Sequence, residues 1–261
     1  LTQFHMDIAA SIQQVTEDVV LKIVRSLSQE FDCDNLCLAG GVALNCVANG
    51  KIERSGGFEN VWVQPASGDA GGSLGAALTT YYHHVGAARS VDRSAADAMS
   101  GSYLGPEFTQ EQIEAELKSA GAAYTFMSEE DMIETCARAI ADDRVVGWMQ
   151  GRMEFGPRAL GARSILGNAA SKSAQKQINL KIKYRESFRP FAPSCMEERI
   201  GDFFEIDRPS PYMLLVAPVR ENRCRRSESE DRTEDIREWV NRERSDVPAI
   251  THVDYSARIQ S

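Results

Sequence analysis

The chain has 261 residues, of which 43% are hydrophobic, and its 29 basic and 38 acidic side chains give a net charge of −9. This composition is typical of a globular protein with room for one large or two medium domains. The acidic balance argues against non-specific nucleic-acid binding, and the lack of an apolar run of about 18 residues predicts no membrane-spanning helix. Six scattered cysteines without a CxxC pair predict reduced thiols and a cytoplasmic protein.

The first third of the chain predicts a helix followed by two strand–glycine–helix units. Apolar residues recur every three or four positions from Ile8 to Leu27, which indicates an amphipathic helix. Short buried strands are expected at 36–39 and 61–64. Each runs into a glycine-containing segment, 40–45 or 65–72, and then into a helix, the second of which covers 74–82. His83 and His84 are expected at the surface.

The rest of the chain predicts a second α/β region after a connection at 86–106. Thr109-x-x-Gln112 and Ser128-x-x-Asp131 are signals for helix starts. Another helix is expected near 174–182. Strands are expected at 124–127, 145–148, 191–196 and 212–216, and an edge strand at 248–254. The densely charged stretch 220–244 predicts an exposed, mobile loop or helix.

Two tandem strand–glycine–helix units favour a nucleotide site, because both would direct helix N-termini and backbone N–H groups at phosphate. Asp69 lies at the tip of the second glycine segment. An aspartate just before a helix is most often an N-cap, and it is also a ligand type for a metal that faces phosphates. The sequence leaves both roles open for Asp69.

Residues 145–168 form a glycine-rich, cationic stretch after an apolar run, and this pattern is typical of an anion-binding loop. Between positions 152 and 189 there are nine basic residues and two acids, Glu154 and Glu186. This segment therefore carries +7, and −9 minus +7 leaves −16 for the rest of the chain. A basic island in an acidic protein indicates a local anionic ligand.

Five motifs together resemble the signatures of the O-carbamoyltransferase family, whose members modify nodulation factors, cephalosporins and aminoglycosides. They cover nearly the whole chain in the family's order. The motifs are LAGGVALNCVANGKI, QPASGDAGGSLGAAL, GWMQGRMEFGPRALGARSIL, YRESFRPFAPS and PAITHVDYSARIQ.

The resemblance implies a mixed fold, α/β and α+β. Residues 1–87 would be the C-terminal part of an actin-like (ASKHA) carbamoyl-transfer lobe, similar to that of the tRNA threonylcarbamoyltransferase. Residues 88–107 would be a linker, and 108–261 a YrdC-like carbamoyl-adenylate-forming domain. Family members are roughly twice as long as this chain, which agrees with a start that looks cut from a longer protein.

The resemblance also implies the chemistry. The YrdC-like site would make carbamoyl-adenylate and pyrophosphate from ATP and carbamoyl phosphate. The first lobe would pass the carbamoyl group to a hydroxyl of a sugar or antibiotic-like acceptor. Fe²⁺ would serve the transfer and Mg²⁺ would accompany ATP. The family's paired metal histidines have no counterpart in this chain, so we expect this fragment to form the adenylate without completing transfer. A homodimer is left open, and no membrane or nucleic-acid partner is implied.

Site residues follow from the resemblance position by position. Arg158, Arg163, Arg185 and Arg189 would contact the phosphates, with Lys183 as a further candidate. Trp148, Gly151, Met153 and Phe155 would shape the pocket, Ser194 would donate a hydrogen bond, and Arg258 would close the site. Gly40, Gly41, Asn45, Gly71 and Gly72 would face the adenylate, with Asp69 as the metal ligand. Tyr255 stands where many family members carry glycine.

Three other interpretations compete with this one. A threonylcarbamoyl-adenylate synthase would need a threonine site and bicarbonate, and the tandem glycine segments argue against it. A YrdC-type RNA-binding module is disfavoured by the net acidity. The third is a structural fragment without activity.

Overall fold

The computed structural model describes residues 2–92, 94–95, 97–226 and 239–261. The chain divides into two compact units. Unit 1 comprises Leu1–Ala96 with Met213–Val216, and unit 2 comprises Asp97–Tyr212 with Ala217–Ser261. The mixed α/β class is confirmed, and the assignment of the units to an actin-like lobe and a YrdC-like domain stays a prediction. Within the described residues, no helix is both long and apolar enough to cross a bilayer.

Unit 1 is built on a parallel strand pair covered by helices. The long helix α1 (Gln3–Glu30) leads to β1 (Asn35–Leu38), a 3-10 turn and α2 (Cys46–Arg54). Strand β2 (Asn60–Val63) then pairs in parallel with β1, and α3 (Asp69–Thr79) follows, extended by one π-helical turn. The predicted helix and both strands are confirmed, but of the strand residues only Leu36 and Val63 are buried. The parallel pairing is the one a strand–helix–strand unit gives.

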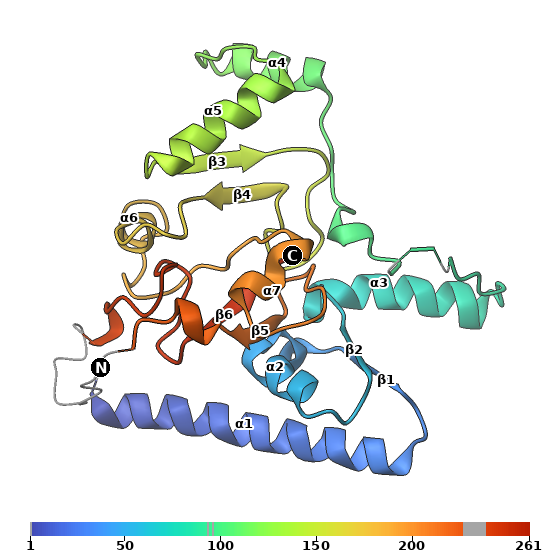
Figure 1. The fold of residues 1–261 in the computed structure, drawn as a ribbon. Helices are drawn as coiled ribbons and strands as arrows, with labels where there is room; N and C mark the ends of the chain where they lie inside the picture. Colours follow the sequence, from blue (N-terminus) through green and yellow to red (C-terminus); the bar gives the residue numbers. More distant parts are fainter. Residues whose placement is uncertain (1, 93, 96, 227–238) are drawn as a thin grey trace. The chain divides into compact units, whose positions relative to one another are not determined.

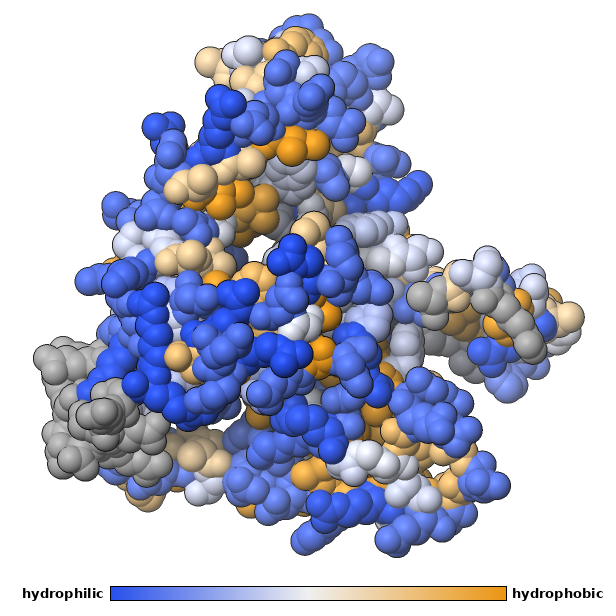
Figure 2. Space-filling model, in the orientation of Figure 1, coloured by the Kyte–Doolittle hydropathy of each residue, from blue (hydrophilic) through white to orange (hydrophobic). Residues whose placement is uncertain are grey.

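The core of unit 1 lies between α1 and the strand pair, where Val24, Leu36 and Ile52 are buried. The opposite face of α1 carries a second apolar stripe that stays exposed: Phe4, Ile8, Ile12, Val15, Val19 and Ile23. In Figure 2 apolar patches lie among hydrophilic surface in the lower part of the view, where Figure 1 places α1. The helix is thus apolar on a wider arc than unit 1 covers.

Unit 2 begins with α4 (Gln110–Ser119) and α5 (Glu129–Ala141), which start at the two predicted capping residues. The Thr109 side chain accepts a hydrogen bond from the N–H of Gln112, and Ser128 accepts one from that of Asp131. Strands β3 (Val146–Met149) and β4 (Arg163–Leu166) then form an antiparallel pair. Figure 1 shows α5 alongside β3.

The remainder of unit 2 contains α6 (Ala174–Lys181), α7 (Ile200–Phe203) and β6 (Ser256–Ile259). Strand β5 (Leu215–Pro218), of which Ala217 and Pro218 belong to unit 2, pairs with β6. Its main core gathers around Phe204, which is 2% exposed, together with Val219, Ala257 and Ile259. The predicted helix near 174–182 is confirmed.

Several strand predictions are wrong. Residues 124–127 have no regular secondary structure, and Phe126 is 61% exposed, so the predicted strand is absent there. Residues 248–254 form turns, and the strand comes afterwards, at β6. Residues 191–196 make only one bridge, from Ser194 to Gln260. The predicted strand 212–216 begins later, at Leu215. Of the predicted loop or helix at 220–244, positions 227–238 lie outside the described residues.

Candidate functional site

The cationic, glycine-rich stretch is a loop between two antiparallel strands. Met149 of β3 pairs with Arg163 of β4, and the N–H of Gln150 donates to the carbonyl of Ala162 across 3.0 Å. The sequence predicted an anion-binding loop after a buried strand that continues a β–α alternation. The loop after a strand is confirmed, but β3 is only half-buried, and the loop returns into a strand rather than a helix.

Glu154 lies at the centre of this loop, and sequence analysis counted it only as an acid in a basic run. Its buried carboxylate accepts hydrogen bonds from three backbone N–H groups of the same loop. They belong to Leu160, Ala162 and Arg163, at N–O distances of 2.7, 2.8 and 3.3 Å. Burial raises the pKa of Glu154, but these hydrogen bonds outweigh it and hold the pKa below its ordinary value. The sequence signal that could have indicated this role is the position of Glu154 as a single acid between Arg152 and Arg158.

The Arg163 guanidinium donates hydrogen bonds to backbone carbonyls of the loop. Nη1 donates to the carbonyls of Gln150 and Ala162, at 3.0 and 2.8 Å, and Nη2 donates to that of Gly151 at 3.2 Å. Gly151 has a φ of +52°, a conformation that favours glycine. Arg158 is half-buried in the same loop. Arg163 thus contacts backbone carbonyls, and its role at phosphate stays a prediction.

The end of the predicted linker packs on this loop. The N–H of Gly105 donates to the carbonyl of Met153, whose own N–H donates to the carbonyl of Pro106. The N–H of Phe155 donates to the carbonyl of Ser102. Residues 102–106 therefore bind the backbone of Met153 and Phe155, two predicted pocket residues. The Met153 side chain is exposed, that of Phe155 is half-buried, and Trp148 is half-buried on β3.

Gln260 joins the loop to the segment that carries Ser194. Its Nε2 donates to the carbonyl of Leu160 at 2.9 Å, beside the Tyr103 hydroxyl, which donates to the same carbonyl at 2.8 Å. Its backbone bridges Ser194. Sequence analysis missed Gln260, because this contact joins residues a hundred positions apart. Arg258, two positions earlier on β6, is half-buried.

Arg185 is fixed on two sides within unit 2. Its Nε donates to Asn179 Oδ1 at 2.6 Å, and its guanidinium carbon lies 5.0 Å from the centre of the Phe191 ring. Asn179 is fully buried, and its amide donates to the carbonyls of Ser187 and Arg189. Burial and the neighbouring Arg189 lower the pKa of Arg185, although Glu186 opposes them. Asn179 is therefore a second positioning residue that the sequence did not reveal.

The remaining predicted cations of this segment are more open. Arg189 forms an exposed ion pair with Glu186, at 2.7 Å. Lys183 and Ser194 are exposed. Exposed ion pairs contribute little to stability, so Arg189 can exchange Glu186 for a ligand at small cost.

Tyr255 has a φ of +63°, and the Arg226 guanidinium carbon lies 4.6 Å from the centre of its ring. A positive φ is the conformation that glycine adopts most easily and that other residues adopt rarely. Nearby, burial and Arg258 lower the pKa of His252, against the opposing charge of Asp254.

The glycine segments of unit 1 lie where each strand meets a helix. The N–H of Gly40 donates to the carbonyl of Ser67 at 3.0 Å, which brings the two segments side by side. Gly40 and Gly41 have open space around the position of a side chain. Asn45 caps α2 through the N–H of Ala48 and also exchanges hydrogen bonds with Gln13 of α1. Its side chain thus has structural partners within unit 1.

Gly71 and Gly72 differ, although they are adjacent and both were predicted to face the adenylate. A side-chain carbon at Gly71 would lie 2.1 Å from the carbonyl oxygen of Ala66, whereas Gly72 has open space. We expect Gly71→Ala to destabilise unit 1 by about 1–3 kcal/mol through overpacking. Gly72→Ala is the matched control, and it should stabilise α3 by about 0.5–1 kcal/mol. Urea denaturation of both variants tests this, and equal midpoints would contradict it.

Asp69 is exposed at the first position of α3, where a carboxylate favours the helix N-terminus. The N-cap position of α3 is Gly68, so Asp69 is not the N-cap residue of this helix. Among the residues that the structure describes, no group of three His, Cys, Asp or Glu side chains comes together to hold a metal ion. Asp69 as a metal ligand stays a prediction.

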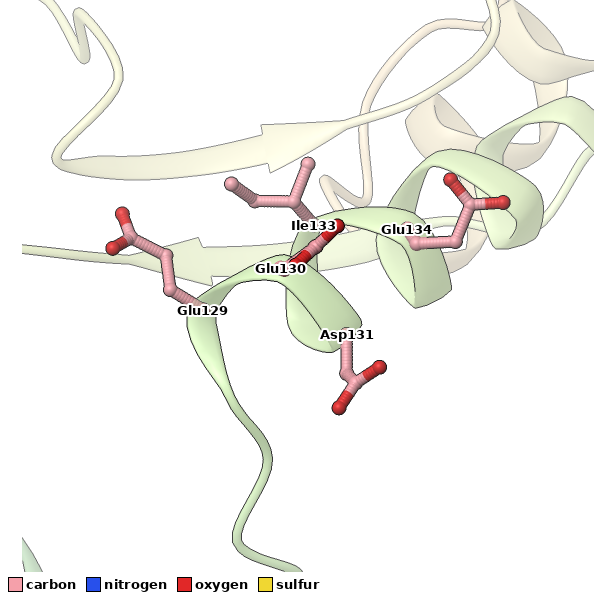
Figure 3. Close-up of a pocket in the computed structure, with 5 residues that line it drawn as sticks. All are labelled: Glu129, Glu130, Asp131, Ile133 and Glu134. Carbon is pink, nitrogen blue, oxygen red and sulfur yellow. The ribbon is translucent and has the colours of Figure 1, made fainter.

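An open hollow lies over the first turns of α5, apart from the predicted site residues. It is lined by Glu129, Glu130, Asp131, Ile133 and Glu134. Figure 3 shows its four carboxylates pointing in different directions. Such a spread suits a solvated helix N-terminus, where acids interact favourably with the helix dipole.

Two family models match the chain in order. The carbamoyltransferase N-terminus model matches residues 2–78, and the carbamoyltransferase C-terminus model matches residues 137–261. The chain is 56% identical to an uncharacterized protein of Synechocystis sp. over 264 residues, which cover all of this chain and 42% of that protein.

Two nodulation proteins are also similar along the whole chain. Nodulation protein NolNO of Sinorhizobium fredii is 39% identical, and 35% of its length is covered. Nodulation protein NolO of Bradyrhizobium diazoefficiens is 38% identical, and 43% of its length is covered. The chain therefore spans less than half the length of these curated relatives.

Proposed function

Because the chain belongs to the carbamoyltransferase family, we propose that its second unit binds ATP and carbamoyl phosphate and forms carbamoyl-adenylate. The chain spans less than half of its curated relatives, so the activity of a whole protein of that length is also a proposal. Both substrates are polyanions, and their mutual repulsion must be neutralised before they react.

The observation that carries this proposal is the cationic loop between β3 and β4, held in shape by hydrogen bonds of its own. Arg158 lies in this loop, and Gln260 ties it to the segment that leads from Arg185 to Ser194. Arg185 is held by Asn179 and Phe191, so little side-chain entropy is lost when it binds an anion. Preorganised cations of this kind suit phosphate chemistry, which depends on positioning and charge more than on a nucleophilic side chain.

The proposed reaction has two steps. Water releases orthophosphate from carbamoyl phosphate, and the resulting carbamate oxygen attacks the α-phosphorus of ATP. The bond from that phosphorus to the bridging oxygen breaks, and pyrophosphate leaves. In this chain, the roles of Arg158, Arg185 and Arg189 are to bind the phosphates and to offset the charge that builds up on pyrophosphate.

Transfer of the carbamoyl group to a hydroxyl of a sugar or antibiotic-like acceptor would follow in the whole protein. Unit 1 would face the adenylate through the segment at Gly40 and Gly41, where the backbone is unobstructed. Two relatives are named nodulation proteins, which favours a sugar-type acceptor. Asp69 would be the metal ligand that this chain contributes.

Equilibrium binding of ATP to this protein, measured by calorimetry at low and high salt, tests the proposal. We expect saturable binding that weakens as salt rises, because screening reduces the attraction between exposed arginines and phosphate. Arg144→Ala should bind ATP as the wild type does. Arg144 is an exposed arginine just before β3 that was not predicted to contact phosphate. A well-folded protein that binds neither ATP nor carbamoyl phosphate would contradict the proposal.

A further inference from the structure

We propose that Glu154 and Arg163 are positioning residues that hold the glycine-rich loop in its binding shape before any ligand arrives. Arg163 then acts through the loop backbone instead of contacting phosphate. The identity of the ligand rests on the function proposed above, whereas the loop arrangement does not.

Glu154 accepts hydrogen bonds from backbone N–H groups of the loop, and Arg163 donates hydrogen bonds to its backbone carbonyls. Three backbone N–H groups, from Leu160, Ala162 and Arg163, converge on the Glu154 carboxylate. Three carbonyls converge on the Arg163 guanidinium, from Gln150, Gly151 and Ala162. The Ala162 carbonyl also accepts from the N–H of Gln150. The other groups of this irregular loop would be left to water without Glu154 and Arg163, so these contacts restrict the loop to one conformation.

The charges of the pair fit this role. An ionised carboxylate is the strongest acceptor that a side chain offers to backbone N–H groups, and a guanidinium is a rigid fork that can serve several carbonyls at once. Glutamine in place of Glu154 keeps the shape but not the charge. Lysine in place of Arg163 keeps the charge but has one nitrogen, so it cannot reach three carbonyls in the same geometry.

The chemistry of lysine separates the two possible roles of Arg163. If Arg163 contacted phosphate, Arg163→Lys would keep part of the affinity for ATP, because lysine binds phosphate as a point charge. It would also leave the ligand-free loop unchanged. If Arg163 positions the loop, Arg163→Lys loosens the ligand-free loop and weakens ATP binding together.

Amide hydrogen exchange, read residue by residue in the ligand-free protein, is the test. We expect the amides of Leu160 and Ala162 to exchange roughly tenfold to a hundredfold faster in Glu154→Gln and in Arg163→Lys. Amides of α5 serve as the internal control for global unfolding and should keep wild-type rates. Glu116→Gln, an exposed glutamate on α4, and Arg144→Lys are the matched controls and should leave the loop amides unchanged.

The outcomes separate the two proposals. Faster loop exchange in both variants, with weaker ATP binding, supports both proposals. Faster loop exchange in a protein whose wild type binds no ATP supports the positioning role and overturns the proposed ligand. Wild-type loop exchange in Glu154→Gln and Arg163→Lys overturns the positioning role, and so does Arg163→Lys with wild-type affinity for ATP.

Discussion

Replacing Arg185 with alanine is expected to weaken ATP binding by about 2–3 kcal/mol, which is roughly 30- to 150-fold in Kd. The side chain is already fixed by Asn179 and stacked on Phe191, so its charge-assisted hydrogen bond to phosphate costs little ordering. Burial and Arg189 both disfavour the cation, so an arriving anion relieves an existing repulsion. Calorimetric titration with ATP measures the change.

Two further variants show whether the fixed geometry matters. Arg185→Lys keeps a positive charge but loses the planar contact with Phe191, and it should bind ATP with an affinity between those of wild type and Arg185→Ala. Arg144→Ala should bind as wild type does. Wild-type affinity in Arg185→Ala would remove Arg185 from the site.

Replacing Phe204 with alanine is expected to destabilise unit 2 by about 3–5 kcal/mol, through lost apolar burial and the cavity left behind. Phe204 is 2% exposed and lies in the cluster that contains Val219 and Ile259. Ile259 precedes Gln260, whose side chain contacts the carbonyl of Leu160. Loss of packing around Ile259 should therefore also disturb the contact between Gln260 and the glycine-rich loop.

Urea denaturation followed by circular dichroism measures this change. Phe188→Ala is the matched control in the same unit, because Phe188 is 47% exposed and its removal should change the free energy of unfolding by no more than about 0.5 kcal/mol. An unchanged midpoint for Phe204→Ala would show that the cluster around Phe204 is not the core of unit 2.

The helices of this protein could be predicted because their signals are local. Thr109 and Ser128 each cap a helix that begins at the next residue, and the period of apolar residues from Ile8 to Leu27 fixed α1. These features depend on neighbours within four positions. Such neighbours can be read directly from the sequence.

Strands depend on partners that the sequence does not state. Residues 124–127 have an apolar pattern but no neighbouring strand, whereas Arg163–Leu166 pairs with β3 although Arg163 and the flanking glycines, Gly161 and Gly167, suggested only a loop. The strand expected at 248–254 comes after Tyr255 instead. Apolar run length alone could not decide between these outcomes.

The candidate site shows the same limit. The residues of the loop could be found from glycine and arginine spacing, but not which arginine contacts what. Arg163 contacts three carbonyls, Arg185 contacts Asn179, and Arg189 pairs with Glu186. Each of these contacts depends on the folded backbone. Glu154 looked like a minor counter-charge, and it proved to be the acceptor around which the loop closes.

Carbamoyl-phosphate-dependent exchange of pyrophosphate into ATP tests the central claim most directly. Exchange reports the reversible formation of an adenylate, so it follows the proposed chemistry without an acceptor. We expect exchange that requires carbamoyl phosphate, persists in Arg144→Ala, and falls about 100-fold or more in Arg158→Ala, since one cation at the phosphates contributes that much to charge stabilisation. A folded protein that binds ATP but catalyses no exchange, or equal exchange in Arg158→Ala, would contradict the account.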